Sequence, residues 1–175
     1  ALVGAADADI ELIDRVGDDP AGIDAALARA TRADVVVFTG GVSAGAYEPV
    51  RLALADRIAF EKVAMQPGKP QAFGVLDDGR LVFGLPGNPV SVAVSFEVFV
   101  RPALLALQGR TVIDRRLARL TASESWGTPP GRRQYLPAAV DLVAGTVRPA
   151  TAGGSGSHLA ASLAGKQYGN ESHDD

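Results

Sequence analysis

The stretch "DVVVFTGGVSAGAYEP", residues 34–49, places a short apolar run directly before a bare polar loop. Val35 to Phe38 are continuously apolar, which is typical of a strand buried on both faces of a sheet. The loop that follows is rich in glycine and serine, so its backbone N–H groups can approach a ligand closely. The stretch therefore predicts a buried strand whose carboxyl end opens into a binding loop.

The flanking segments predict an α/β fold. Residues 9–16 have the composition of a strand and residues 18–34 that of a helix, with Asp18 or Asp19 as cap and Pro20 in the first turn. Strand, helix and strand in succession predict a crossover and a mostly parallel sheet. Further strands are expected at 60–65, 71–76 and 81–86, and a buried helix at 88–109 that Pro102 kinks or splits.

Composition excludes several classes of protein. The chain has 175 residues, 47% of them hydrophobic, a net charge of −3 and no cysteine. We expect no apolar run near the roughly 18 residues that a membrane span needs. The weak negative charge argues against nucleic acid or a membrane surface as partner, and the absence of cysteine excludes disulfides and thiolate metal sites. A cytoplasmic location fits this composition.

The texture of the sequence changes after residue 110. Short strand-like pieces alternate with the loops "SESWGTPPG" and "AGGSGS", which indicates a small all-β unit. We expect an α/β domain over residues 1–109, a small and incomplete C-terminal β domain over 110–164, and a polar tail over 165–175.

Two loops follow strands of the expected sheet, at the place where open parallel sheets bind ligands. Glycine N–H groups, hydroxyls and a helix N-terminus in these loops suit an anion such as phosphate. Either loop alone is more often a simple turn. The candidate residues are Gly40, Gly41, Ser43 and Gly45 in the first loop and Pro86, Gly87, Asn88, Pro89 and Ser91 in the second.

Charged residues near these loops are further candidates. Lys62 and Lys69 flank the Pro-Gly turn of "KVAMQPGKP" and would hold a phosphorylated ligand, or would only solubilise the rim of a hairpin. Glu48 is the candidate Mg²⁺ ligand, because Mg²⁺ is held by one or two carboxylates together with substrate phosphates. A solvated carboxylate at a helix start is the alternative. Arg132 and Arg133 can reach phosphate or simply lie in solvent.

Three motifs in this order, "TGGVSAGAYE", "MQPGKPQAFG" and "GLPGNPVSVAVSFEVFVRPAL", resemble the molybdopterin molybdenumtransferase family of the MoeA and gephyrin E-domain type. The resemblance implies a three-layer α/β domain, a following small β barrel and a homodimer. It also implies insertion of molybdate into adenylylated molybdopterin with release of AMP, aided by Mg²⁺. The glycine loop would hold the pterin phosphate, and Glu48, Lys62 and Lys69 would act in catalysis.

Ser157 resembles a serine of the family that faces the neighbouring subunit's site. The sequence departs from the family at Gln66, Ala46 and Pro137, where a basic residue, an acid and an arginine are common. By the same resemblance we expect a fragment that lacks the first strand and the N-terminal domains. The alternatives are a non-catalytic molybdopterin-binding or scaffold fragment, or a molybdopterin adenylyltransferase.

Overall fold

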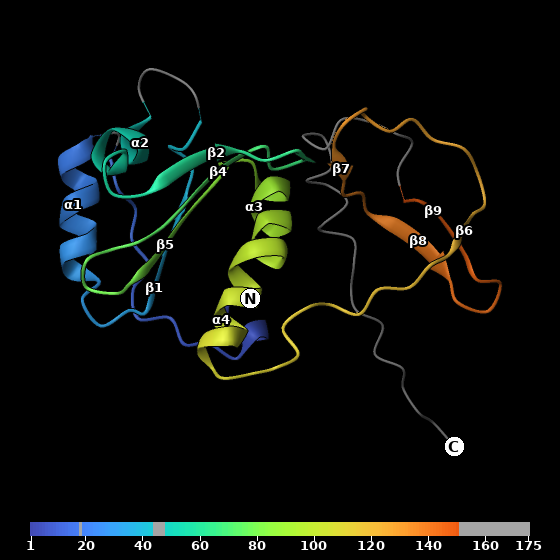
Figure 1. Ribbon diagram of the computed structural model, residues 1–175, viewed down its shortest axis with the longest axis horizontal. Helices are drawn as coiled ribbons and strands as arrows, with labels where there is room; N and C mark the ends of the chain where they lie inside the picture. Colours follow the sequence, from blue (N-terminus) through green and yellow to red (C-terminus); the bar gives the residue numbers. More distant parts are fainter. Residues whose placement is uncertain (18, 44–47, 151–175) are drawn as a thin grey trace.

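A computed structural model of the chain describes residues 1–17, 19–43 and 48–150. Its centre is a four-stranded sheet in the order β1-β5-β4-β2 (Figure 1). The strands are β1 (Val35–Thr39), β5 (Leu81–Leu85), β4 (Pro70–Val75) and β2 (Ala59–Lys62). The parallel pairing of β1 with β5 confirms the expected parallel element. The other two pairs are antiparallel, so the sheet is mixed rather than mostly parallel.

A tight turn explains the antiparallel pairing of β4 with β5. Gly79 has a φ of 87°, and the turn is closed by the Leu76 N–H, which donates to the Arg80 carbonyl at 2.9 Å. The Arg80 guanidinium then reaches across to the end of α1 (Pro20–Arg29), where it donates to the carbonyls of Leu27 and Ala30 at 2.8 and 2.9 Å. The turn is therefore tied to the helix layer.

The helices α1 and α2 (Pro49–Leu54) cover one face of the sheet. Asp19 caps α1 as predicted, since its carboxylate accepts from the Gly22 N–H at 2.8 Å. The apolar side chains of both helices pack on those of β4 and β5. This core includes Ile23, Leu27, Val42, Val50, Leu54, Ile58, Ala72, Leu76 and Val82.

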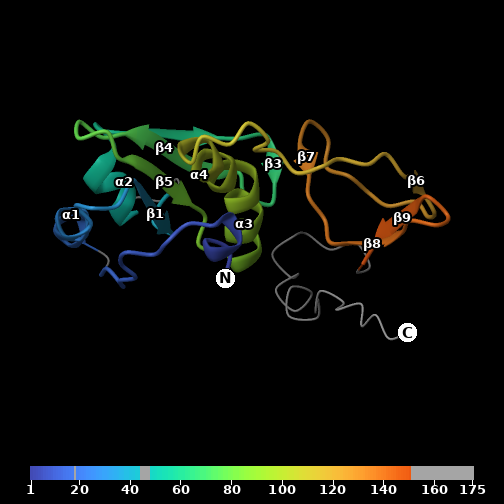
Figure 2. The same ribbon diagram turned by 90° about the horizontal axis from the view of Figure 1, so that it is seen from below.

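A long helical segment covers the other face. It consists of α3 (Pro89–Ser95), the π-helical turn η2 (Phe96–Val100) and α4 (Arg101–Leu107). The π-helical turn ends two residues before Pro102, which lacks the N–H that a regular helix would use, so the predicted interruption is present. Phe96 and Val100 pack on Phe83 and Leu85 of the sheet. The short 3-10 helix η1 (Gly4–Ala6) lies beside α4 (Figure 2).

The expectation that no segment has the length and composition of a membrane span is wrong. Pro89–Leu107 is 19 residues long with a mean hydropathy of 1.8, which is long and apolar enough to cross a membrane by those two measures. In this fold the segment packs one side against the sheet, as the core helix of a soluble protein also does.

The strand expected at residues 9–16 is also absent. The structure has no regular secondary structure there, and Ile10 and Ile13 are 51% and 83% exposed. The segment instead lies along the helix layer, where Asp14 pairs with Arg29 and Val16 packs against the core. With no strand beside it, the segment makes no ladder of backbone hydrogen bonds.

Beyond the long helix the chain forms short strands set apart from the α/β unit (Figures 1 and 2). β3 (Met65–Gln66) pairs with β7 (Arg133–Gln134), and a three-stranded sheet has the order β6-β9-β8. Its strands are β6 (Thr121–Ala122), β9 (Thr146–Pro149) and β8 (Ala138–Asp141). Within the described residues no sheet closes into a barrel, so the expected barrel is not confirmed.

Candidate functional site

The two predicted binding loops meet. The Gly40 N–H donates to the Leu85 carbonyl at 2.8 Å, which joins the end of β1 to the end of β5. A Cβ on Gly87 would lie 3.4 Å from the Gly40 Cα, so the two backbones are nearly in contact. Gly40 also has a φ of 91°, which favours glycine. The loops after β1 and β5 therefore form one surface instead of two separate cradles.

Gly41 fixes the start of α2 above this surface. Its φ is 70°, and a Cβ there would come within 2.9 Å of the Val50 Cγ2 atom. The Gly41 carbonyl accepts from the Arg51 N–H at 3.1 Å, which anchors the helix to the loop. Ser43 is exposed at the last described position before the gap. The predicted site residue Gly45 lies outside the described residues, as does the departure Ala46.

Glu48 is the residue that caps α2 by position, yet its side chain makes no capping hydrogen bond. Glu48 is half-buried. Across the described ranges no group of three or more His, Cys, Asp or Glu side chains is close enough to hold a metal ion. A cation at Glu48 would therefore need most of its ligands from a substrate.

Two of the backbone N–H groups at the start of α3 are hydrogen-bonded to the helix's own cap residue. The Asn88 side-chain oxygen accepts from the N–H groups of Val90 and Ser91 at 3.0 and 3.3 Å, with Pro89 in the first turn. These two donors are therefore not open to an anion. Ser91 is itself buried, at 7% exposure. Gly87, in contrast, is exposed beside Gly40, whereas Pro86 is buried.

Lys62 and Lys69 lie at the same end of the β2–β4 hairpin. Lys62 pairs in register with Pro70, and the Lys69 carbonyl accepts from the Val63 N–H at 2.8 Å. Both lysine side chains are exposed, and in the described part of the chain neither ammonium has a carboxylate within ion-pair distance. Because β4 runs antiparallel to β5, its start lies at the edge of the sheet where β5 ends.

A buried polar cluster holds the turn that carries Lys69. The Gln71 side chain donates to the Gly68 carbonyl and to the Ser95 hydroxyl, each at 2.7 Å. Gln71 is 7% exposed and Ser95 is fully buried. Gly68 has a φ of 103° and leaves no room for a Cβ, which would lie 2.9 Å from Met65 and 3.0 Å from Ser95. The Pro-Gly turn is thus fixed to α3 from inside, a role that the sequence analysis missed.

Arg132 reaches the same turn from the other side. Its Nη1 donates to the Gln66 side-chain oxygen at 3.3 Å. Gln66 is the last residue before the turn, and its peptide bond to Pro67 is cis. Local pattern gave no sign of this contact, because the two residues are 66 positions apart.

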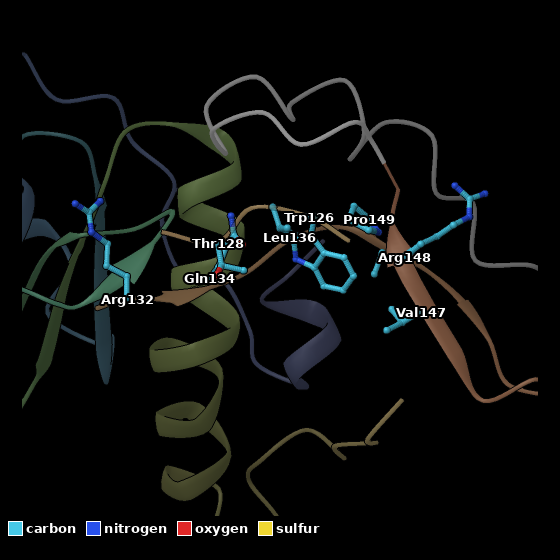
Figure 3. A pocket seen from close by; sticks show the side chains of 9 residues that line it. Trp126, Thr128, Arg132, Gln134, Leu136, Val147, Arg148 and Pro149 are labelled. Carbon is cyan, nitrogen blue, oxygen red and sulfur yellow. The ribbon is translucent and has the colours of Figure 1, made fainter. Parts of the chain in front are cut away.

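A separate cavity of about 430 Å³ lies in the second unit (Figure 3). Trp126, Leu136 and Val147 gather around it, whereas the Arg148 guanidinium points away from them. Arg132 is among the residues that line the cavity, whereas none of the predicted site residues of the α/β unit is, and Ser157 lies outside the described residues.

Comparison with known proteins places this geometry in context. The family described as "Probable molybdopterin binding domain" matches residues 1–106. A "Molybdopterin molybdenumtransferase 2" of Mycobacterium tuberculosis is 47% identical over 142 residues, which cover 75% of this chain and 34% of that protein. A "Molybdopterin molybdenumtransferase" of Haemophilus influenzae is 42% identical over 86 residues, which cover 48% of this chain and 21% of that protein.

Solved structures of similar fold come from the same kind of protein. The molybdopterin biosynthesis moeA protein from Pyrococcus horikoshii OT3 superposes with a TM-score of 0.68 at 25% identity, covering 93% of this chain and 37% of that chain. A molybdenum cofactor biosynthesis protein from Pyrococcus furiosus has a TM-score of 0.59 at 26% identity, covering 83% of this chain and 47% of that chain. The chain therefore covers about a fifth to a half of the length of these relatives.

Proposed function

The chain belongs to the molybdopterin-binding domain family of the MoeA type, and from this premise we propose that it acts in molybdenum cofactor synthesis. The proposed reaction inserts molybdate into adenylylated molybdopterin and releases AMP. The substrate would bind where the loops after β1 and β5 meet. The relatives are longer than the part that this chain matches, so the activity of the whole relatives is a proposal for this chain.

The contact of Gly40 with Gly87 carries the proposal. It brings two glycine loops together at the carboxyl ends of two parallel strands, where backbone N–H groups can surround an anion. The Lys69 turn starts from the same edge of the sheet and adds an unpaired ammonium. A phosphorylated pterin and a doubly charged oxyanion both require such positive surroundings.

The chemistry would consist mainly of positioning and electrostatic stabilisation. Water breaks the phosphoanhydride bond between the pterin phosphate and AMP, and AMP leaves as the phosphate monoester. Glycine-loop N–H groups other than that of Gly40, which is bonded to the Leu85 carbonyl, would hold the pterin phosphate, while Lys62 and Lys69 would stabilise charge on the phosphate and molybdate oxygens. We assign no general base, because no described side chain at this edge makes a contact that indicates such a role.

Mg²⁺ fits the donor set only with help from substrate. Glu48 offers one half-buried carboxylate that its own helix does not use, and Mg²⁺ is commonly held by one or two carboxylates plus substrate phosphates. Glu48 would hold the ion, and the ion would neutralise charge on phosphate and molybdate oxygens.

A homodimer and a cytoplasmic location complete the proposal. Phe73 and Val75 of β4 are 47% and 55% exposed, on the sheet face that the long helix covers only in part. A second copy of the chain covering these side chains would remove apolar area from water.

A binding module without turnover is the second candidate. Gln66 carries no charge at the turn, and across the described ranges Glu48 belongs to no group of three or more side chains that could hold a metal ion. Such a module would bind the pterin and leave its adenylate intact.

AMP release from adenylylated molybdopterin, measured with and without molybdate in the presence of Mg²⁺, tests the proposal. We expect molybdate-dependent release, and we expect Glu48→Gln to raise the Mg²⁺ concentration needed for half-maximal release. Glu61→Gln, which removes an exposed carboxylate of β2, is the matched control and should leave that requirement unchanged. Binding without release would favour the binding module, and absence of both would overturn the proposal.

A further inference from the structure

We propose that Arg132, from the second unit, binds the tetrahedral oxyanion of the substrate at the Lys69 turn. This inference rests on the proposed function and extends it to a residue outside the α/β unit. Three features lie together here. They are the rigid Pro67-Gly68 turn, the backbone pairing of β3 with β7 that fixes the second unit beside it, and the Arg132 guanidinium hydrogen-bonded to Gln66.

Backbone hydrogen bonds fix the second unit beside the turn. The Arg133 N–H donates to the Ala64 carbonyl at 2.9 Å, and the Tyr135 N–H donates to the Gln66 carbonyl at 2.8 Å. These bonds belong to the parallel pairing of β3 with β7, in which Gln66 is the partner of Gln134. Arg132 directly precedes β7, so its backbone position relative to the turn is set by this pairing.

The guanidinium is oriented by Gln66. The Gln66 side-chain oxygen accepts one hydrogen bond from Arg132, at 3.3 Å. Figure 3 shows the Arg132 guanidinium on the side of the α/β unit, apart from the side chains that gather around Trp126. In the described ranges no carboxylate lies within ion-pair distance of it. A guanidinium has five N–H donors, so most of them are open to a ligand.

The Pro67-Gly68 turn is held in place by buried contacts. Gln71 and Ser95 hold the Gly68 carbonyl from the protein interior, and Gly68 has no space for a side chain. Lys69, the next residue, is exposed with its ammonium unpaired within the described chain. Arg132 thus adds a planar, permanently charged donor at a turn whose backbone is held in place and which carries Lys69, an arrangement suited to phosphate or to molybdate.

The experiment measures two dissociation constants separately, one for adenylylated molybdopterin and one for molybdate alone. Arg132→Gln should weaken binding of at least one of them about tenfold, as expected for loss of a hydrogen bond to a charged group. The affected ligand identifies the oxyanion as the pterin phosphate or as molybdate. Arg148→Gln, the same change at an exposed arginine of β9 that is not part of the β3–β7 pairing, should alter neither constant by more than about twofold.

Two further variants exclude a purely structural role. Arg132→Lys keeps the charge and should restore most of the affinity at low salt, with a dissociation constant that rises as salt screens the contact. Gln66→Ala removes the acceptor that orients the guanidinium and should have a smaller effect, about twofold to fourfold.

The outcomes separate this inference from the proposed function. If Lys69→Ala weakens binding whereas Arg132→Gln leaves both constants unchanged, the role of Arg132 is overturned and the proposed site stands. An equal effect of Arg132→Gln at all salt concentrations, not restored by Arg132→Lys, also overturns it. If the unaltered chain binds neither ligand, the proposed function fails and this inference fails with it.

Discussion

The two units of the molecule are held in place by different means. Among the described residues, the buried hydrophobic side chains run from Ala6 to Leu105 and belong to the α/β unit. In the described part of the second unit only Pro149 is buried, and residues 110–148 contribute no buried side chain. The second unit is positioned instead by backbone pairing of β7 with β3 and by Arg132 on Gln66. The first unit is therefore specified by its own packing, and the second takes its position from a neighbour's backbone.

The largest expected effect comes from a substitution that creates a cavity in the α/β core. Leu54 is fully buried between α2 and the sheet. Leu54→Ala should lower the free energy of unfolding by about 2–5 kcal/mol, since the lost contacts add to the cost of the cavity. Urea denaturation followed by circular dichroism measures this change.

Val140→Ala in β8 provides the matched control, because Val140 is 51% exposed. We expect a change within about 0.5 kcal/mol, as for surface substitutions in general. A comparable loss in both variants would mean that the second unit has a stabilising core of its own, and the contrast would break.

A smaller effect is expected where the two units approach each other. Gln71→Ala removes both hydrogen bonds that tie the Lys69 turn to α3, and leaves the Gly68 carbonyl and the Ser95 hydroxyl buried without this partner. The cost should be about 1–3 kcal/mol, together with weaker binding of adenylylated molybdopterin. Ser95→Ala keeps the bond from Gln71 to Gly68 and should bind the pterin more tightly than Gln71→Ala does. The reverse order would show that the turn does not depend on Gln71.

Local chemistry in the sequence predicts a large part of the α/β unit. The cap at Asp19 and the position of the strand at Val35–Phe38 depend on neighbours within a few residues, and the structure confirms both. The expected burial of that strand on both faces is wrong, because β1 lies at the edge of the described sheet and Val37 is 37% exposed. Apolar composition alone predicts a strand at 9–16, and this prediction is wrong, because a strand also requires a partner strand.

The site was less accessible to sequence reasoning. The two loops could be expected at one edge of a sheet, but their contact at Gly40 and Gly87 depends on the pairing of β1 with β5. The clamp formed by Gln71 and Ser95 joins residues 24 positions apart, and Arg132 meets Gln66 across 66. No local pattern indicates such contacts. The domain boundaries near residue 109 stay a prediction, as do the roles of Glu48, Lys62 and Lys69.

Two tight turns, one in each unit, repeat the contrast on a smaller scale. In the β8–β9 turn, Asp141 accepts from the Val143 and Ala144 N–H groups at 3.0 and 2.9 Å, so its contacts stay within the turn. In the β4–β5 turn, Asp78 pairs with Arg80, which also reaches the end of α1. The hydrogen bond from Arg80 lowers the pKa of Asp78 from its usual 3.8.

A lowered pKa implies a stabilisation that is present above pH 3.8 and is lost as the pH falls through the lower folded value. Asp78→Asn should therefore be slightly less stable than the parent at pH 7, and the difference should shrink as the pH falls below 3.8, when Asp78 of the parent protonates. Because the Asp78 side chain is exposed, this is the smallest effect of the series. Thermal unfolding from pH 7 to pH 2.5 measures it, with Asp77→Asn as a control for charge in the same turn. A difference that grows toward low pH would show that Asp78 does not stabilise the turn through its charge, and the link from this turn to α1 would then depend on Arg80 alone.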